Sequence, residues 1–128
     1  MISFETAVRA AGSPLHLTEN GFEKTFVFPP DFVGFDGHFP GAPILPAMVQ
    51  LMAGAQAAAE ALSQLRAGHY TVSGVTRGKF LKPVEPDEQL VVMGTLTEDG
   101  AAPSAVVRIL SGEDAVSLFR VTFSEVKP

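Results

Sequence analysis

The sequence predicts an α+β fold in which one curved antiparallel sheet wraps around a single long helix. Residues 47–66 are mostly strong helix formers and apolar residues, with no charge before Glu60. A hairpin signal precedes this run, and four runs with strand character follow it. A helix that is apolar on nearly all sides must be enclosed by other structure. Because a sheet that curls around the helix satisfies this requirement and the order of elements, we expect that architecture.

Length and composition predict one globular domain over residues 1–128. The net charge of −5 argues against nucleic acid as a partner, since phosphate binding needs a basic surface. There is no cysteine, which excludes a disulfide, a thiol nucleophile and a thiolate metal site. Metal-ligand spacing is missing around His16 and His69, so we expect no metal and no cofactor. Neither a signal peptide nor a run of roughly 18 apolar residues is found, and we expect a cytoplasmic protein without membrane contact.

The N-terminal part contains one clear strand signal. Residues 3–10 alternate only weakly and fit either a strand or a helical turn. The runs 15–18 and 22–28 predict a β-hairpin, because Asn20-Gly21 supplies the positive φ angles that a two-residue turn needs.

A stiff loop leads into the long helix. Three prolines in the segment 40–46 exclude regular structure there. Pro46 is a favourable first-turn residue, so we expect the helix to begin near it and to end before Gly68. The same loop holds His38, and the first turn of the helix offers unpaired backbone N–H groups. A base beside an anion site suits chemistry in which a proton leaves carbon and negative charge collects on a carbonyl oxygen.

Four runs with strand character follow the helix: 70–81, 88–97, 104–111 and 115–126. Short segments rich in Pro, Gly and Asp separate these runs, which predicts short antiparallel connections and a meander. Apolar residues share one face in two of the runs: Leu90, Val92 and Leu96, and then Phe119, Val121 and Phe123.

Two motifs carry a resemblance to a known family. The first is Phe35-Asp36-Gly37-His38-Phe39-Pro40-Gly41-Ala42-Pro43-Ile44-Leu45-Pro46, continued by Val49-Gln50 and Ala55-Gln56. The second extends from Gly78 to Leu90. Together they resemble the active-site loop, helix start and strand end of the 3-hydroxyacyl-(acyl carrier protein) dehydratases of bacterial fatty-acid synthesis, over about residues 22–97. The resemblance implies the hotdog fold, a curved antiparallel sheet around one central helix, and a dimer joined through a continuous sheet.

The resemblance also implies roles for individual residues. The family histidine that matches His38 takes the α-proton of a 3-hydroxyacyl thioester, and a backbone N–H at the helix start, here Ala47, receives the thioester oxygen. A carboxylate fourteen residues after the histidine, on the partner subunit's helix, handles the departing hydroxyl in that family. Met52 occupies this position and can neither donate nor accept that proton.

No carboxylate replaces the family acid neatly. Gln56 shares the helix face of Met52 and fits a water or the hydroxyl, Glu60 is two turns deeper, and Asp36 is a natural brace for the loop. Both Gln50 and Gln56 need hydrogen-bond partners on a buried helix; for Gln56 a structural and a substrate-facing role are equally open. The family pattern further implies substrate contacts from five residues: Phe39, Pro40, Gly41, Pro46 and Phe80.

Three features have a plainer explanation beside the functional one. His38 alone would fit a brace for a Pro/Gly-rich turn. Six phenylalanines before the proposed site either wall an acyl tunnel or form core: Phe22, Phe26, Phe28, Phe32, Phe35 and Phe39. A cationic cluster either receives an acidic carrier protein or is a solvated strand end: Arg77, Lys79 and Lys82.

These observations favour a dehydratase-like enzyme of fatty-acid or related acyl-chain biosynthesis. Its substrates are expected to be 3-hydroxyacyl thioesters on acyl carrier protein or coenzyme A. Met52 motivates an alternative, a catalytically degenerate subunit that binds acyl chains or pairs with a related chain that contributes the acid. A hotdog thioesterase is the remaining alternative. We expect a homodimer or a higher oligomer, with a hetero-dimer as the other arrangement.

Overall fold

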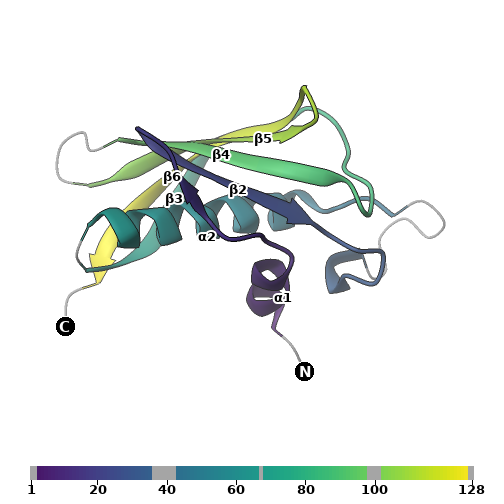
Figure 1. Cartoon of the computed structure of the whole chain (residues 1–128), viewed down its shortest axis with the longest axis horizontal. Helices are drawn as coiled ribbons and strands as arrows, with labels where there is room; N and C mark the ends of the chain where they lie inside the picture. Colours follow the sequence, from purple (N-terminus) through teal and green to yellow (C-terminus); the bar gives the residue numbers. More distant parts are fainter. Residues whose placement is uncertain (1–2, 36–42, 67, 98–101, 127–128) are drawn as a thin grey trace.

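The described part of the chain folds into a six-stranded antiparallel sheet that lies over one long helix (Figure 1). The computed structural model describes residues 3–35, 43–66, 68–97 and 102–126. The elements, in chain order, are α1 Phe4–Ala10, β1 His16–Leu17, β2 Gly21–Val27, the 3-10 turn η1 Val33–Phe35, α2 Ala47–Leu65, β3 His69–Phe80, β4 Gln89–Thr97, β5 Ser104–Ser111 and β6 Asp114–Val126. The predicted α+β architecture is confirmed.

α2 forms where the sequence predicts the long helix. Pro46 is its N-cap, with φ −61° and ψ 147°. One face is buried against the sheet by mostly small residues: Val49, Gln50, Ala53, Gly54, Ala57, Ala58, Ala61 and Leu62. The opposite face is only half covered, and Met48 near its start is 67% exposed. The expectation that the helix is enclosed on most sides is therefore correct only for the side that faces the sheet, because a single sheet layer covers one face.

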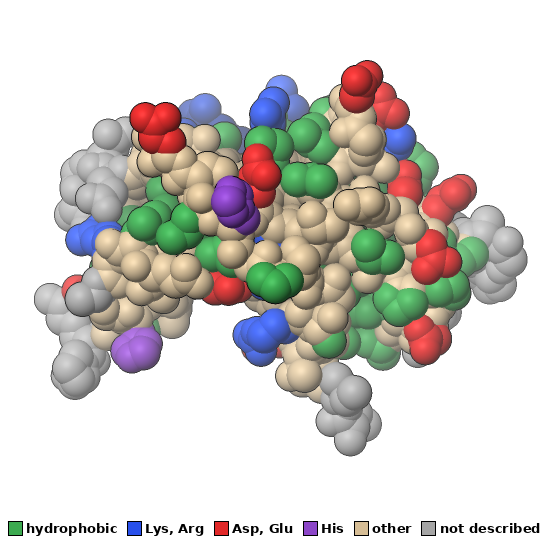
Figure 2. Space-filling model, in the orientation of Figure 1, with side chains coloured by type: hydrophobic (Ala, Val, Ile, Leu, Met, Phe, Trp, Pro, Cys, Tyr) green, Lys and Arg blue, Asp and Glu red, His purple; other side chains and the backbone are tan. Residues whose placement is uncertain are grey.

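Alternation along the strands builds the rest of the core. Side chains on the face toward α2 are buried: Phe22, Phe26, Leu90, Val92, Val107, Ile109, Phe119, Val121 and Phe123. The shared faces predicted for the second and fourth runs are confirmed, with Leu96 half-buried at the margin. Hydrophobic side chains also remain on the surface, interspersed with acidic ones on the face drawn in Figure 2.

The predicted meander is wrong at β3. The strand order across the sheet is β1-β2-β4-β5-β6-β3, so β3 pairs with β6 at one edge, and β4 pairs with β2 instead of β3. The segment 81–88 is therefore a crossing connection rather than a tight turn. Main-chain hydrogen bonds hold it, with Leu81 donating to Val116 and Asp87 to Phe28, both at 2.8 Å. Turn residues show where a strand ends, but they do not show which neighbour the next strand takes.

The N-terminal segment forms a short helix followed by a β-hairpin. Residues 4–10 form α1, whose N-cap Ser3 accepts a hydrogen bond from the N–H of Thr6 at 3.1 Å. β1 and β2 form the expected hairpin. The predicted positive φ angles at Asn20-Gly21 are wrong, because the described residues with positive φ are Arg77, Asp87, Gly68 and Gly112. The turn is closed by Thr18 donating to the carbonyl of Gly21 at 2.9 Å.

Gly54 sets how closely α2 approaches the sheet. A Cβ on Gly54 would overlap Cζ of Phe119 and lie 3.0 Å from Cγ1 of Val107, and both side chains are buried. Alanine gains about 1 kcal/mol in helix propensity, whereas overpacking costs about 1–3 kcal/mol.

We therefore expect Gly54→Ala to lower the free energy of unfolding by about 1 kcal/mol, measured by urea denaturation. Gln64→Ala, on the exposed side of α2, is the control and should change it by less than about 0.5 kcal/mol. A Gly54→Ala protein more stable than the wild type would show that the helix has room to move away from β6.

Candidate active site

Most of the predicted catalytic loop lies outside the described residues. This applies to the predicted base His38, to the predicted contact residues Phe39, Pro40 and Gly41, and to Asp36. The roles assigned to these residues remain predictions. What the structure does describe are the two flanks of the loop, the start of the helix that follows it, and a cavity along that helix.

Both flanks of the loop pack at the first turn of α2. Before the loop, a Cβ on Gly34 would meet Cγ2 of Val49 at 3.2 Å, which places η1 against the helix start. After the loop, the N–H of Leu45 donates to the carbonyl of Val84 at 2.8 Å. The chain therefore leaves the described structure and re-enters it at the N-terminal end of α2.

The backbone N–H of Ala47 lies at this end of α2 and could donate a hydrogen bond to a ligand. Ala47 is the first helical residue and is exposed. Val49 and Gln50 donate to the carbonyl of Pro46, at 3.0 and 3.4 Å, whereas no hydrogen bond among the described residues uses the N–H of Ala47. Such a free N–H at a helix N-terminus favours a negative charge. The geometry fits the predicted oxyanion donor, and the half-buried Pro46 precedes it directly.

A cavity of about 690 Å³ runs along the half-covered face of α2. That volume lies within the roughly 300–1,000 Å³ of small-molecule sites. Met52 lines this cavity together with other residues of α2 and with residues of three further elements: from α2 Ala55, Gln56, Ala59, Glu60 and Ser63, from α1 Glu5 and Arg9, from β2 Lys24, and from β3 Tyr70, Thr71 and Val72. The position of the family acid therefore faces space that a ligand can occupy.

Gln56 is tied to the N-terminal helix. Its Nε2 donates to the backbone carbonyl of Glu5 at 3.0 Å, which joins α2 to α1. Its Oε1 is buried and has no partner among the described residues. An unpaired buried acceptor costs about 1–3 kcal/mol unless a ligand or water donates to it. The amide is thus a structural contact that also lines the cavity, and its substrate-facing role remains a prediction.

Lys24 and Glu60 form an ion pair at the cavity wall. The distance from Lys24 Nζ to Glu60 Oε1 is 2.8 Å, and the side chains are 7% and 40% exposed. The ammonium group also lies 5.5 Å from the ring centroid of Phe26. Sequence reasoning missed Lys24. The available signal was a single cation at the position between Phe22 and Phe26 on the inward face of the predicted strand 22–28.

No described carboxylate on α2 lies beside Met52. Glu60 is eight residues further along the helix, which corresponds to roughly 12 Å along its axis. Its carboxylate is also engaged with Lys24. Glu60 therefore cannot act on the atoms that a residue at position 52 would reach.

The phenylalanines before the site are core residues. Five of the six are described and buried: Phe22, Phe26, Phe28, Phe32 and Phe35. Neighbouring rings are in contact, with centroids 4.7 Å apart for Phe28 and Phe32. None of the five lines the cavity beside Met52. The core interpretation is confirmed for these five residues, and the acyl tunnel stays a prediction.

The second motif lies at the end of β3. Phe80, a predicted substrate contact, is 43% exposed there and does not line the cavity along α2. Of the nearby cations, Lys82 makes an exposed ion pair with Asp114 at 3.3 Å. Arg77 is at a bulge in the strand, with φ 58°.

The described ranges contain no helix long and apolar enough to cross a membrane. They also contain no group of three or more His, Asp or Glu side chains that could hold a metal ion.

Known proteins resemble this chain in sequence and in fold. The ApeI-like family model, described as ApeI dehydratase, matches residues 15–117. The chain is 36% identical over 89 residues to the 3-hydroxyacyl-(acyl carrier protein) dehydratase FabZ of Thermus thermophilus. That match covers 65% of this chain and 63% of the relative, so the chain spans less than two thirds of its length.

Two solved structures show the same fold at low sequence identity. The dehydratase heterocomplex ApeI:P from Xenorhabdus doucetiae matches with a TM-score of 0.64 and 19% identity, over 83% of this chain and 88% of that one. A hypothetical thioesterase protein with coenzyme A from Streptococcus pneumoniae matches with a TM-score of 0.75 and 12% identity, over 96% and 94%. The hotdog fold is confirmed. Because the family model extends over both sequence motifs and most of the chain, this protein belongs to the ApeI-like dehydratase family.

Proposed function

We propose that this protein dehydrates 3-hydroxyacyl thioesters carried on acyl carrier protein or coenzyme A. The observation that carries the proposal is the junction between the His38 motif and α2, where the N–H of Ala47 is unpaired among the described residues. A cavity lined by Met52 runs along the same helix and supplies room for an acyl chain. Membership of the ApeI-like family supports the same reaction.

In the proposed reaction His38 removes a proton from C2 of the acyl chain. The N–H of Ala47 stabilises the negative charge that develops on the thioester oxygen. The bond between C3 and the hydroxyl oxygen then breaks, a double bond forms between C2 and C3, and the hydroxyl leaves as water after it gains a proton. Met52 has no proton to give, so this proton arrives through solvent. A missing general acid typically slows such a step by about 10²–10⁴-fold.

Met52 favours a second candidate, a subunit that pairs with a related chain. β3 is an edge strand, and its exposed side chains include Val72 and Val75, at 40% and 37%. If two copies pair along β3, both helices carry Met52 and neither site has the acid. A related chain with a carboxylate at the matching position would complete the site that contains His38. The ApeI:P neighbour, which is a heterocomplex, supports this arrangement.

Turnover of matched thioesters tests the first candidate. Incubation with 3-hydroxydecanoyl and 2-decenoyl thioesters of pantetheine should interconvert the two, and His38→Ala should lower the rate by about 10²–10⁴-fold. His69→Ala, at the exposed start of β3, is the control and should retain the wild-type rate.

Three other outcomes separate the alternatives. No interconversion, with His38→Ala indistinguishable from the wild type, would contradict a dehydratase. Release of free thiol would identify a thioesterase instead. A slow reaction that a related hotdog chain accelerates would favour the paired subunit.

A further inference from the structure

The face of the sheet that points away from α2 carries hydrophobic side chains at positions where a strand beside water normally carries polar ones. In β4, Leu90 and Val92 are buried toward α2, so Val91 and Met93 between and after them point outward. The paired strands β5 and β6 add three more outward apolar side chains: Val106, Leu110 and Leu118. All five are only half-buried, and α1 and α2 both lie on the opposite side of the sheet (Figure 1). Such a cluster indicates a surface that another molecule covers.

A groove of about 240 Å³ lies on this outer face, and charges of opposite sign flank it. Met93 and Val106 supply apolar surface in the groove, and Glu23 and Arg108 supply the charges. The strand register places Met93 directly between Glu23 of β2 and Arg108 of β5. The two charges are thus two strands apart, roughly 10 Å, which is too far for an ion pair. Within the described residues neither of them has an ion-pair partner.

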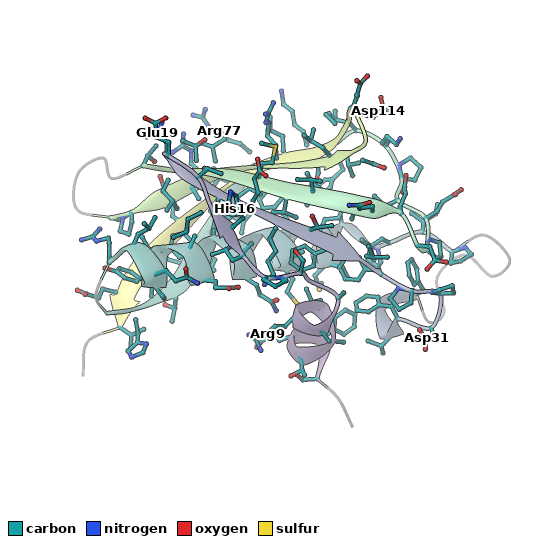
Figure 3. All side chains as sticks on the ribbon, viewed as in Figure 1. Arg9, His16, Glu19, Asp31, Arg77 and Asp114 are labelled. Atoms are coloured by element: carbon teal, nitrogen blue, oxygen red, sulfur yellow. The ribbon has the colours of Figure 1, made fainter. Side chains whose placement is uncertain are left out.

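Charges on the outer face separate by sign on the two sides of β4. On one side, the β1–β2 hairpin carries Glu19 and Glu23. On the other side, β5, β6 and β3 carry Arg108, Arg120 and Arg77. Figure 3 shows the labelled Glu19 and Arg77 on the side of the sheet that is away from α2. The outer face therefore has an acidic half, an apolar middle and a cationic half.

We propose that this outer face binds the outer face of a second copy of the chain. The two copies are related by a two-fold axis that lies between the sheets, parallel to β4 and directly above Met93. Rotation about this axis turns one sheet over and exchanges the two sides of β4. Glu23 of each copy then faces Arg108 of the other copy, and the two Met93 side chains meet at the centre. The sheets stack about 10 Å apart, as in a β-sandwich.

Charge complementarity selects both the occupant and the axis. A two-fold axis that ran across the strands would place Glu23 over Glu23 and Arg108 over Arg108, and like charges in an interface cost free energy. A partner with charge of a single sign would match only half of the face. The apolar cluster supplies the affinity, and the charges set the orientation. The edge of β3 stays free in this arrangement, so the proposal is independent of the reaction and of any pairing along that edge.

Charge reversal tests the arrangement by analytical ultracentrifugation of the full chain. We expect Glu23→Arg and Arg108→Glu each to halve the number of chains in the particle, with a dissociation constant at least tenfold higher, because each variant sets like charges opposite one another at two symmetric positions. The double variant Glu23→Arg with Arg108→Glu restores opposite charges and should recover the wild-type particle. Glu113→Arg, at the exposed turn between β5 and β6, is the matched control and should keep the wild-type size.

A cross-link tests the position of the axis without any change of charge. The chain has no cysteine, so Met93→Cys introduces a single thiol at the proposed axis. A bis-maleimide with a spacer of about 8 Å should join two copies, because stacked sheets are about 10 Å apart. Ser124→Cys is the control, at an exposed position of β6. Its two copies would be displaced sideways by four strand spacings, roughly 19 Å, and should not be joined.

Three results would overturn the proposal. The first is a wild-type particle whose size does not change in either reversal variant, which would leave the outer face to a partner of a different kind. The second is a double variant that stays as small as the single variants, because the loss would then not come from the contact between Glu23 and Arg108. The third is equal cross-linking of Met93→Cys and Ser124→Cys. Circular dichroism of each variant confirms that a smaller particle is still folded.

Discussion

Met52→Glu should raise the rate of 3-hydroxyacyl thioester dehydration at least tenfold. The substitution places a carboxyl group at the cavity wall, at the position where the resembling family carries its acid. A positioned general acid contributes about 10²–10⁴-fold, and a tenfold gain allows for imperfect placement. Rates of conversion between 3-hydroxyacyl and 2-enoyl thioesters, measured for the protein without any partner chain, give the comparison.

Met52→Gln is the matched control for this gain. Glutamine has the shape of glutamate but supplies no proton at neutral pH, so its rate should stay at the wild-type level. A second variant, Met52→Glu with His38→Ala, should lose the gain, because the added acid needs the base. If Met52→Glu folds and shows no increase, then the geometry around position 52 differs from that of the family. The paired-subunit function would then require the partner for more than a carboxylate.

Gly21→Ala should lower the free energy of unfolding by about 2–3 kcal/mol. A Cβ at this position would overlap the carbonyl oxygen of Gly94 and lie 2.8 Å from its carbonyl carbon. Both atoms belong to the backbone of β4, which is paired with β2 on one side and with β5 on the other. The clash therefore cannot be relieved by a side-chain rotation. The gain from a less flexible unfolded chain, about 0.4–1 kcal/mol, is too small to offset it.

Urea denaturation of Gly21→Ala and Gly78→Ala measures this effect. A Cβ on Gly78 would lie 3.4 Å from Cε2 of Phe80, an ordinary van der Waals contact. Gly78→Ala should therefore change stability by less than about 0.5 kcal/mol. A similarly small change for Gly21→Ala would mean that β2 and β4 separate at this point without loss. Gly21 would then matter for the turn and not for strand contact.

Local patterns were sufficient for the type and the ends of most elements. A run of helix formers with no charged residue before Glu60 predicted α2, and Pro46 marked its start. Alternating apolar residues predicted β4, β5 and β6 to within a few residues. These signals depend on neighbours in the chain, and so they can be recognised without the fold. The same reasoning left residues 3–10 undecided, since the capping contact of Ser3 is a single hydrogen bond in a short helix.

For the site, local sequence patterns revealed less than the folded structure did. The sequence predicted roles for His38, Ala47 and Met52 because a family motif and its spacing point to them, and these roles remain predictions. It did not identify Lys24 or Arg9, which belong to no motif. Lys24 and Glu60 are 36 residues apart, and Gln56 lies 51 residues from the carbonyl that it binds. Contacts of this kind have no local signature.

The sequence by itself determined the architecture, the family motifs and the absence of a carboxylate at position 52. Only the tertiary structure decided that β3 lies at the sheet edge beside β6, that Asn20-Gly21 is not a turn with positive φ, and that Lys24 meets Glu60 along a cavity. The physical reason is the range of the interactions. Helix and strand formation follow from residues close in the chain, whereas strand order, ion pairing and cavity shape result from packing between segments that only the folded chain brings together.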